Sequence, residues 1–313
     1  MPFTAKSGKF NASINTVEFG TGDKAVKIGG ENVFPLYSFD AAIENAPKVG
    51  IEITDFGMEH EPECIKKYYE GCATLADMAR KAASMEGVDF LSFRMEGGDP
   101  NGANKSTEEL IGELKEIADA VDLPLVVCGC KNVEKDAELF SKAAEALNGK
   151  NAVILSAKEE NYKTVGAAAG LAYKQIVGAE SAVDINLAKQ LNVLISQLGV
   201  DSKSVVMNVG SAAVGYGFEY VVSTMDRIKA AALQQGDATL QMPIITPVAS
   251  EAWGVKEAMA SETDAPEWGS QEERGIDMEV ETAMAVIAAG SNAVILKHPE
   301  SIKIISGLMK ELV

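Results

Sequence analysis

Eight short apolar segments recur along this chain of 313 residues, and most of them are followed by residues with the spacing of an amphipathic helix. They span residues 49–55, 88–95, 123–128, 151–156, 175–178, 204–209, 242–248 and 293–297. Apolar runs that alternate with helical periodicity are typical of parallel strands joined by helices. Eight such repeats predict an α/β fold, a closed (β/α)8 TIM barrel, in which residues at the ends of the strands form the functional mouth.

The first 47 residues differ from the rest of the chain. Short alternating segments at 17–19, 25–28 and 33–36 are separated by glycines, as in a β-meander. We therefore predict two units: an N-terminal β-meander at residues 1–47 that caps the bottom of the barrel, and the barrel itself at residues 48–313. A long connection at 56–71 follows the first barrel strand, and barrels place function in such connections.

The charge balance excludes two classes of partner. The chain carries 28 basic and 46 acidic residues, a net charge of −18, which repels nucleic acid and anionic lipid. Residues 1–10 lack the apolar core of a signal peptide, and no apolar run approaches the roughly 20 residues that span a bilayer. We expect a cytoplasmic protein with no nucleic-acid partner and no membrane association.

The residues at the predicted strand ends offer little acid–base chemistry. Histidine occurs only at His60 and His298, and no pair of carboxylates divides the work of acid and base. The four cysteines are too few and too irregularly spaced for a disulfide framework. Cys128 and Cys130 lack the second pair of ligands that a zinc site or an iron–sulfur cluster requires. We predict no catalytic residues and no metal ligands in this chain.

Two features allow two interpretations each. Lys297, at the end of the eighth strand, fits a Schiff-base lysine or, as we favour, an ion pair with a neighbouring carboxylate. The glycine-rich stretch 210–217 fits either a close backbone approach to a ligand or a turn that needs positive φ angles. Neither feature by itself names a function.

Several short motifs occur in a defined order along the chain. They are RMEGGDPNGANKSTEE at 94–109, EENYKT at 159–164, DINLAKQLN at 184–192, GYGFEY at 215–220, EAW at 251–253, PEWG at 266–269 and KHPE at 297–300. Together these motifs resemble the small subunit of the corrinoid iron–sulfur protein, which is the delta-subunit family of the CO dehydrogenase/acetyl-CoA synthase system. The resemblance runs from about the first barrel strand to the C-terminus, and the barrel is the fold of that family.

The resemblance implies a methyl carrier of the reductive acetyl-CoA (Wood–Ljungdahl) pathway of anaerobic carbon fixation. In that family a heterodimer accepts methyl from methyltetrahydrofolate through a separate methyltransferase and delivers it to acetyl-CoA synthase/CO dehydrogenase. The large subunit holds the iron–sulfur cluster and most of the cobamide, whose cobalt is the reactive atom, and the small subunit's barrel mouth covers the corrin. This implies a non-catalytic subunit without a cluster of its own, and the chain indeed lacks an Asp-x-His-x-x-Gly signature and a four-cysteine motif.

A mouth that covers a reactive cobalt should exclude water and offer no ligand to the metal. Histidine or thiolate would bind the cobalt, whereas Asn, Ser, Thr, Gly and aromatic residues would not. The residues that we predict to contact the cobamide are Asn101, Ser156, Asn161, Asn208, Gly210, Tyr216, Thr246 and Trp253.

An alternative reading is a pterin-dependent methyltransferase, which handles the same methyl donor on a barrel. A pterin requires a carboxylate at its amino-pyrimidine edge and a hydrogen-bond donor near N5. Asp55 or Asp184 could supply the carboxylate and Asn208 the donor.

The loop around Trp268 is a candidate docking surface for a partner subunit.

Overall fold

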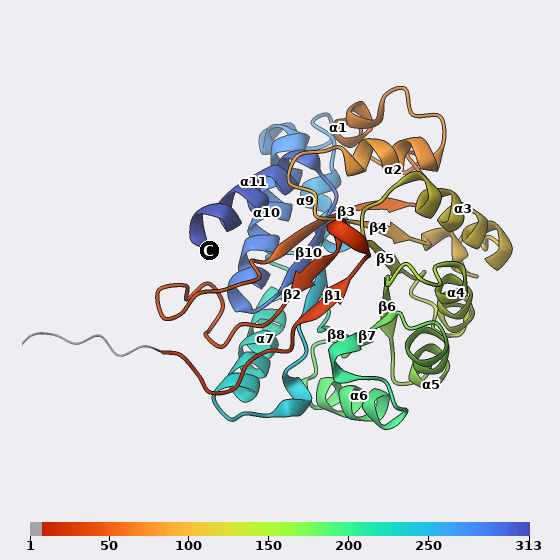
Figure 1. Cartoon of the computed structure of the whole chain (residues 1–313). Helices are drawn as coiled ribbons and strands as arrows, with labels where there is room; N and C mark the ends of the chain where they lie inside the picture. The colour runs from red at the N-terminus through yellow and green to blue at the C-terminus, as the bar shows by residue number, and fades with distance from the viewer. Residues whose placement is uncertain (1–7) are drawn as a thin grey trace, which may run out of the picture.

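Eight parallel strands form a barrel in the computed structural model, which describes residues 8–313 (Figure 1). Each predicted apolar segment overlaps one strand, so the (β/α)8 prediction is confirmed. The strands are β3 (Lys48–Thr54), β4 (Phe90–Arg94), β5 (Leu125–Cys128), β6 (Val153–Ala157), β7 (Ile176–Glu180), β8 (Val205–Asn208), β9 (Ile245–Pro247) and β10 (Ala293–Leu296).

The strands run in parallel in the order β8-β7-β6-β5-β4-β3-β10-β9. The ring closes where Met207 of β8 pairs with Ile244, the residue before β9, through a hydrogen bond from the Met207 amide to the Pro243 carbonyl of 2.8 Å. Because all the strands are parallel, their carboxyl ends meet at one end of the barrel, here called the mouth, and their amino ends meet at the bottom.

Helices surround the barrel, one or more after each strand (Figure 1). The longer ones are α2 (Leu75–Ala83), α3 (Thr107–Ala120), α4 (Val133–Ala146), α6 (Ile185–Gln197), α7 (Phe218–Leu233), α10 (Gln271–Ala289) and α11 (Pro299–Leu312). The short ones are α1 (Glu63–Lys66), α5 (Tyr162–Val165), α8 (Ala249–Ala252) and α9 (Lys256–Met259), and α5 continues as a π-helical turn, Gly166–Ala172.

The helix starts follow from capping side chains. Ser106 accepts a hydrogen bond from the Glu109 amide, as its spacing predicts, and Pro299 lies in the first turn of α11. Ser181 and Asp184 have the sequence spacing of a capping box, which predicts a helix start at Ser181, but α6 begins three residues later. Asp184 is its N-cap and accepts from the amides of Asn186 and Leu187.

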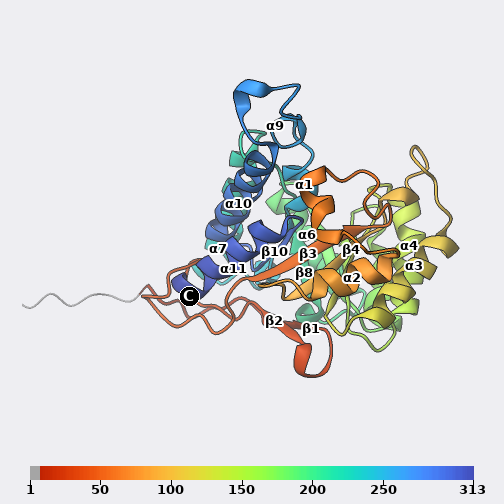
Figure 2. The ribbon, with the colours of Figure 1, turned by 90° about the horizontal axis from the view of Figure 1, so that it is seen from above.

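A two-stranded antiparallel hairpin closes the bottom of the barrel. It consists of β1 (Val17–Phe19) and β2 (Val26–Ile28), and Figure 2 shows it at the end of the molecule opposite to α9. Its inward side chains are packed in one buried cluster with residues from the barrel interior. The predicted third strand of a meander, at residues 33–36, is wrong, because these residues form turns and bends instead.

The packing of the hairpin against the barrel depends on aromatic rings. Phe19 meets Phe90 of β4 edge to face, with ring centroids 5.5 Å apart, and both side chains are fully buried. Gly50 of β3 makes room for this contact, since a Cβ atom there would lie 2.1 Å from the Phe90 ring. Residues 1–7 of the predicted cap lie outside the described residues, and the division of the chain at residue 47 stays a prediction.

The interior of the barrel changes character along its axis. Side chains alternate across a strand, so the residue two positions after an inward-facing apolar residue of the bottom layer also faces inward. On β3 and β4 these positions are Glu52, Ser92 and Arg94, and all three are buried. The charged groups therefore lie nearer the mouth than the apolar ones.

Among the described helices, none combines the length and apolar character needed to cross a bilayer.

Candidate functional site

A cavity of about 290 Å³ opens at the mouth of the barrel. It lies over β4 to β9 and not over β3 and β10, because the residues that line it come from the ends of those six strands and the loops after them. The lining residues at the strand ends are Arg94, Cys128, Ser156, Glu180, Asn208 and Pro247. We refer to this space as the mouth cavity.

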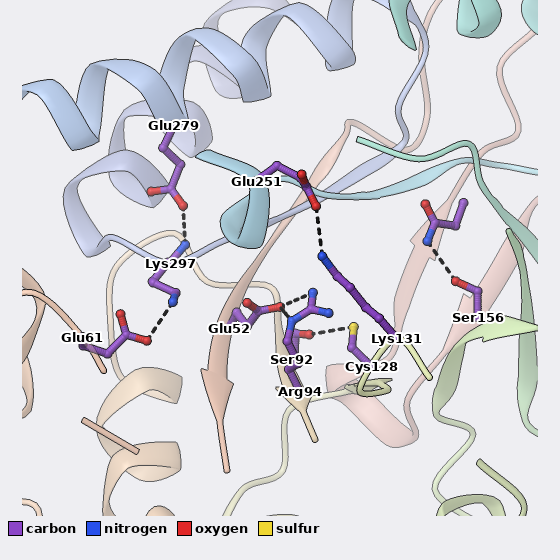
Figure 3. A network of polar contacts seen from close by, with 11 residues as sticks. Glu52, Glu61, Ser92, Arg94, Cys128, Lys131, Ser156, Glu251, Glu279 and Lys297 are labelled. Atoms are coloured by element: carbon purple, nitrogen blue, oxygen red, sulfur yellow. Dashed lines mark hydrogen bonds and ion pairs between the residues drawn. The ribbon is translucent and has the colours of Figure 1, made fainter. Parts of the chain in front are cut away.

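A buried ion pair forms one wall of the mouth cavity (Figure 3). Arg94 donates from Nε to Oε2 of Glu52 at 3.0 Å, and its Nη2 lies 2.8 Å from the same oxygen. Burial alone would lower the pKa of Arg94, but the charge of Glu52 raises it above its ordinary value. The guanidinium is therefore a permanent cation whose charge is neutralised within the wall.

Beside Arg94, the thiol of Cys128 lines the cavity. Its Sγ lies 3.6 Å from the hydroxyl of Ser92, and burial raises the pKa of Cys128 to about 11. A thiol with that pKa is protonated at neutral pH, and so it is a poor metal ligand and a poor nucleophile. The cavity wall thus presents a neutral sulfhydryl group.

The opposite wall is a chain of neutral groups that ends on a carboxylate. Asn208 accepts a hydrogen bond from the Gly210 amide at 3.0 Å, which orients its side-chain NH₂ toward Ser156. That NH₂ donates to the Ser156 hydroxyl at 2.9 Å, and the hydroxyl donates to Glu180 at 3.2 Å. Lys158 neutralises Glu180 across 3.3 Å. Each polar side chain is held in a single orientation by its neighbours.

The β3 and β10 side of the mouth is closed by ion pairs and backbone contacts (Figure 3). Lys297 lies 2.7 Å from Glu61 of the long β3–α2 connection, and Glu279 of α10 accepts from the Lys297 amide at 2.6 Å. Burial alone would lower the pKa of Lys297, but Glu61 and Glu52 raise it above its ordinary value. The favoured ion-pair interpretation of Lys297 is confirmed, since a Schiff-base lysine needs a lowered pKa.

The structure brings three of the eight predicted contact residues into the mouth cavity: Ser156, Asn208 and Gly210. Gly210 has a φ angle of +97°, which favours glycine, and the same stretch has positive φ angles at Gly215 and Gly217. The turn interpretation of residues 210–217 is therefore confirmed, while Gly210 also lines the cavity.

The other five predicted contact residues do not line the mouth cavity. Three are buried in structural contacts: Asn161 donates to the Val133 carbonyl, Thr246 is 2.8 Å from the Ser291 hydroxyl, and Trp253 stacks on His298. Asn101 and Tyr216 are exposed on loops, where Asn101 bonds Asp99 and Tyr216 bonds Glu257. Contact of any of the eight with a cobamide stays a prediction.

The carboxylates predicted for a pterin site are elsewhere. Asp55 is buried, accepts from the Gly97 amide at 2.9 Å and pairs with Lys105 at 3.1 Å. Asp184 is the N-cap of α6. Neither lines the mouth cavity, and contact of either with a pterin stays a prediction.

Sequence reasoning missed five charged residues of the mouth cavity: Lys131, Asp136, Lys158, Glu180 and Glu251. Glu180 was missed because the fifth strand was taken to end at Gly178, whereas β7 continues to Glu180. The alternation of Gly178 with Glu180 could have placed its side chain inside the barrel. Lys131 and Glu251 lie three and four residues beyond their strands, where no strand periodicity applies.

The arrangement favours binding and shielding rather than proton transfer. The residues that line the cavity include no histidine, and the Cys128 thiol is protonated. Of the carboxylates that line it, Glu180 and Glu251 each face a lysine, and Asp136 accepts hydrogen bonds from the amide and the thiol of Cys130. Hydroxyl and amide groups of Ser156, Asn208 and the loops after β8 and β9 fill the space between these pairs. Such a surface can hydrogen-bond a polar ligand without ligating a metal on it.

Comparison with known proteins identifies relatives along nearly the whole chain. A family model described as "CO dehydrogenase/acetyl-CoA synthase delta subunit" matches residues 16–309. The chain is 30% identical to "Acetyl-CoA decarbonylase/synthase complex subunit delta 1" of Methanosarcina thermophila, over 94% of this chain and 67% of the relative. It is 31% identical to the delta subunit of the same complex of Methanothermobacter thermautotrophicus, over 95% of this chain and 75% of the relative.

Among solved structures, a dihydropteroate synthase from Xanthomonas albilineans has a similar backbone. The TM-score is 0.56 and the sequence identity is 12%, with coverage of 95% of this chain and 98% of that chain. At this identity the likeness concerns the fold, and it agrees with the barrel described above.

Proposed function

This chain belongs to the CO dehydrogenase/acetyl-CoA synthase delta subunit family, and we propose that it is the small subunit of a corrinoid methyl carrier in the acetyl-CoA pathway. Its barrel mouth covers a cobamide that the large subunit mainly holds. The observation that carries this role is the mouth cavity, whose walls are polar but whose lining residues include no histidine and a protonated thiol at Cys128.

The donor set of the mouth fits a corrin ligand. A corrin is flat, bears carboxamide side chains at its edge and holds a metal that histidine or thiolate would bind. Ser156 and Asn208 offer hydroxyl and amide groups to such side chains, and Gly210 lets a flat ligand approach the backbone. Cys128 stays protonated, and His298 is fully buried between Trp253 and Tyr68.

When bound, the cobamide would supply the methyl-accepting and methyl-donating metal. The residues of this chain bind, orient and exclude water. In the Arg94–Glu52 and Lys158–Glu180 pairs the opposite charges cancel, so the wall of the mouth carries no net charge from them. The hydrogen bonds of Ser156 fix the groups that face the ligand. A preorganised wall of this kind shields a reactive metal without reorganising around it.

The remaining parts of the role follow from the same proposal. The chain is a non-catalytic subunit in a heterodimer with the large subunit, which carries the iron–sulfur cluster. Its further partners are the methyltetrahydrofolate methyltransferase and acetyl-CoA synthase/CO dehydrogenase, in the cytoplasm. The loop around Trp268 stays a candidate for docking; its ring lies beneath Lys256 and Arg274, and it is 37% exposed.

The test is an anaerobic assay of the purified chain, alone and with its large subunit, for cobamide retention and for methyl transfer from methyltetrahydrofolate to free cobamide. We expect retention in the two-chain complex and no turnover by this chain alone. Asn208→Ala should weaken retention, because it removes a polar group from the cavity wall. Asn148→Ala is the matched control, since this asparagine is exposed and does not line the cavity.

Turnover by the isolated chain would contradict the non-catalytic role and favour the pterin-dependent methyltransferase. For that alternative the carboxylates that line the cavity are Asp136, Glu180 and Glu251, and each is already engaged, by Cys130, by Lys158 and Ser156, and by Lys131 respectively. Equal retention by the Asn208→Ala variant and the native chain would instead remove the mouth from the cobamide site.

A further inference from the structure

One ion pair crosses the mouth cavity from side to side. Lys131, in the loop after β5, lies 3.2 Å from Glu251 of α8, which follows β9 (Figure 3). Both residues line the cavity. We call this contact the crossing pair.

The strand order shows that the crossing pair spans the full width of the barrel. In the ring, β4, β3 and β10 separate β5 from β9 on one side, and β6, β7 and β8 separate them on the other. The strands that precede Lys131 and Glu251, β5 and β9, are therefore opposite one another in the barrel. The pair connects loops that share no backbone hydrogen bonding among the described residues.

The backbone at Lys131 has a left-handed conformation. Lys131 has a φ angle of +70°, in the left-handed region that glycine or asparagine adopts more easily. The position thus carries a long cation where the local turn favours a smaller residue. The next residue, Asn132, caps α4 and so holds the loop in place.

The crossing pair differs from the other ion pairs of the mouth in exposure. The side chains of Arg94 and Glu52 are 8% and 1% exposed, whereas those of Lys131 and Glu251 are 65% and 36% exposed. Exposed pairs are weak and are screened by salt, and so they break and re-form readily. The Arg94–Glu52 pair is a fixed part of the wall, and the side chains of Lys158 and Glu180 are each 26% exposed. The crossing pair is therefore the most exposed and the most readily displaced of these three pairs of the mouth, within residues 8–313.

We propose that the Lys131–Glu251 ion pair is a displaceable bar that closes the mouth cavity in the free chain and opens when a large ligand held by a partner protein seats on the mouth. The identity of that ligand, a corrin, rests on the proposed function. The existence of the bar rests on the geometry alone. Opening would free a lysine and a glutamate, on opposite rims, to hydrogen-bond the edge of the incoming ligand.

The thiol of Cys128 lines the same cavity and reports on the bar. The test measures the rate at which a small uncharged alkylating reagent, iodoacetamide, labels Cys128 in the full chain at fixed pH and low salt, read by peptide mass spectrometry. Cys64 and Cys72 do not line the cavity and serve as internal references. The variants are Lys131→Met, Glu251→Gln, and the swapped double variant Lys131→Glu with Glu251→Lys.

We expect both single variants to label Cys128 about 2- to 5-fold faster, which is the population change that an exposed ion pair supports. The swapped variant should return to the native rate, and added salt should accelerate the native chain more than the single variants. A purely electrostatic effect on the thiol would act in opposite directions, because removing a cation raises a thiol pKa and removing an anion lowers it.

Three results would each overturn the bar. The Cys128 labelling rate could stay unchanged in both single variants, or it could change in opposite directions in the two. The third such result is a swapped variant that labels Cys128 as fast as the single variants do. Altered rates at Cys64 and Cys72 identify a variant with a disturbed fold, and Lys131→Gln and Glu251→Ala then replace it. The readout uses the isolated chain without any corrin, so its failure is distinct from a failure of the methyl-carrier role.

Discussion

The two ends of this barrel are closed in different ways. At the bottom, the hairpin β1–β2 inserts Val17, Phe19 and Ile28 against apolar interior residues such as Phe90. At the mouth, ion pairs and hydrogen bonds surround a cavity, and the one pair that crosses it is exposed. Apolar packing resists opening because every separated contact is exposed to water. Polar contacts exchange with water at little net cost, so the mouth can be remodelled and the bottom cannot.

The largest loss of stability on mutation is expected at a residue of the hairpin. Phe19→Ala should lower the free energy of unfolding by about 3–5 kcal/mol, because it leaves a cavity in a fully buried aromatic contact. Urea denaturation followed by circular dichroism measures this, with Phe39→Ala, at a side chain 78% exposed, as the control. A loss of less than about 1 kcal/mol would mean that the hairpin is not part of the cooperative unit.

The buried pair at the mouth comes next. Arg94→Met should cost about 3 kcal/mol, since it leaves the Glu52 carboxylate buried without its counter-ion. Adding Glu52→Leu should recover most of that loss, because an apolar pair needs no counter-ion. The control is Lys142→Met, whose exposed pair with Glu145 should contribute less than about 1 kcal/mol. If the double variant is no more stable than Arg94→Met, the unpaired charge is not the cause.

The rim of the mouth should respond to acid through His298. Burial lowers the pKa of His298 to about 4 from the ordinary 6.5, so between these values the unfolded chain binds a proton that the folded chain does not. Stability is therefore lost as the pH falls from 6.5 to 4, by about 3 kcal/mol for this group. His298→Asn keeps an acceptor for the Glu300 amide and should flatten the profile in this window.

The control for this titration is His60→Asn, an exposed histidine whose replacement should leave the profile unchanged. Stability is measured by thermal unfolding at pH values from 4 to 7. An equally steep profile in the His298→Asn variant would assign the acid sensitivity to other groups.

The smallest effect is expected in the neutral network of the mouth. Ser156→Ala leaves the NH₂ of Asn208 without its acceptor and should cost about 1 kcal/mol. Ser141→Ala on α4, where the hydroxyl bonds a helix carbonyl, is the control and should change stability by less than about 0.5 kcal/mol. A cost above about 2 kcal/mol for Ser156→Ala would show that the mouth is as rigid as the bottom.

The strands could be predicted because their signal is local. Each run of apolar residues between turn signals marks a strand, and strand ends differ from the prediction by three residues or fewer. The first strand of the hairpin was predicted from an equally local signal, because Val17–Phe19 alternates between apolar and polar residues, and the structure buries the apolar ones. Residues 33–36 have a similar composition but lack a partner strand, and a strand without a partner leaves its backbone groups unpaired.

The site was predicted less well, because chemical type does not specify direction. Asn161 and Asn208 are both asparagines near strand ends, but the Asn161 side chain bonds backbone groups of Lys158 and Val133, whereas Asn208 faces the cavity. Lys131 and Glu251 lie 120 positions apart in the chain, and nothing in their local sequence indicates that they meet. Loops beyond a strand have no periodicity from which direction could be read.

The sequence by itself determined the barrel, the family and the position of each strand to within three residues, because these depend on local periodicity and on short motifs in order. Only the tertiary structure decided which half of the mouth stays open, which ion pairs are buried, and that one pair crosses the cavity. The reason is physical: a charge pair forms between atoms that are close in space, and closing the ring brings together loops that the chain keeps far apart.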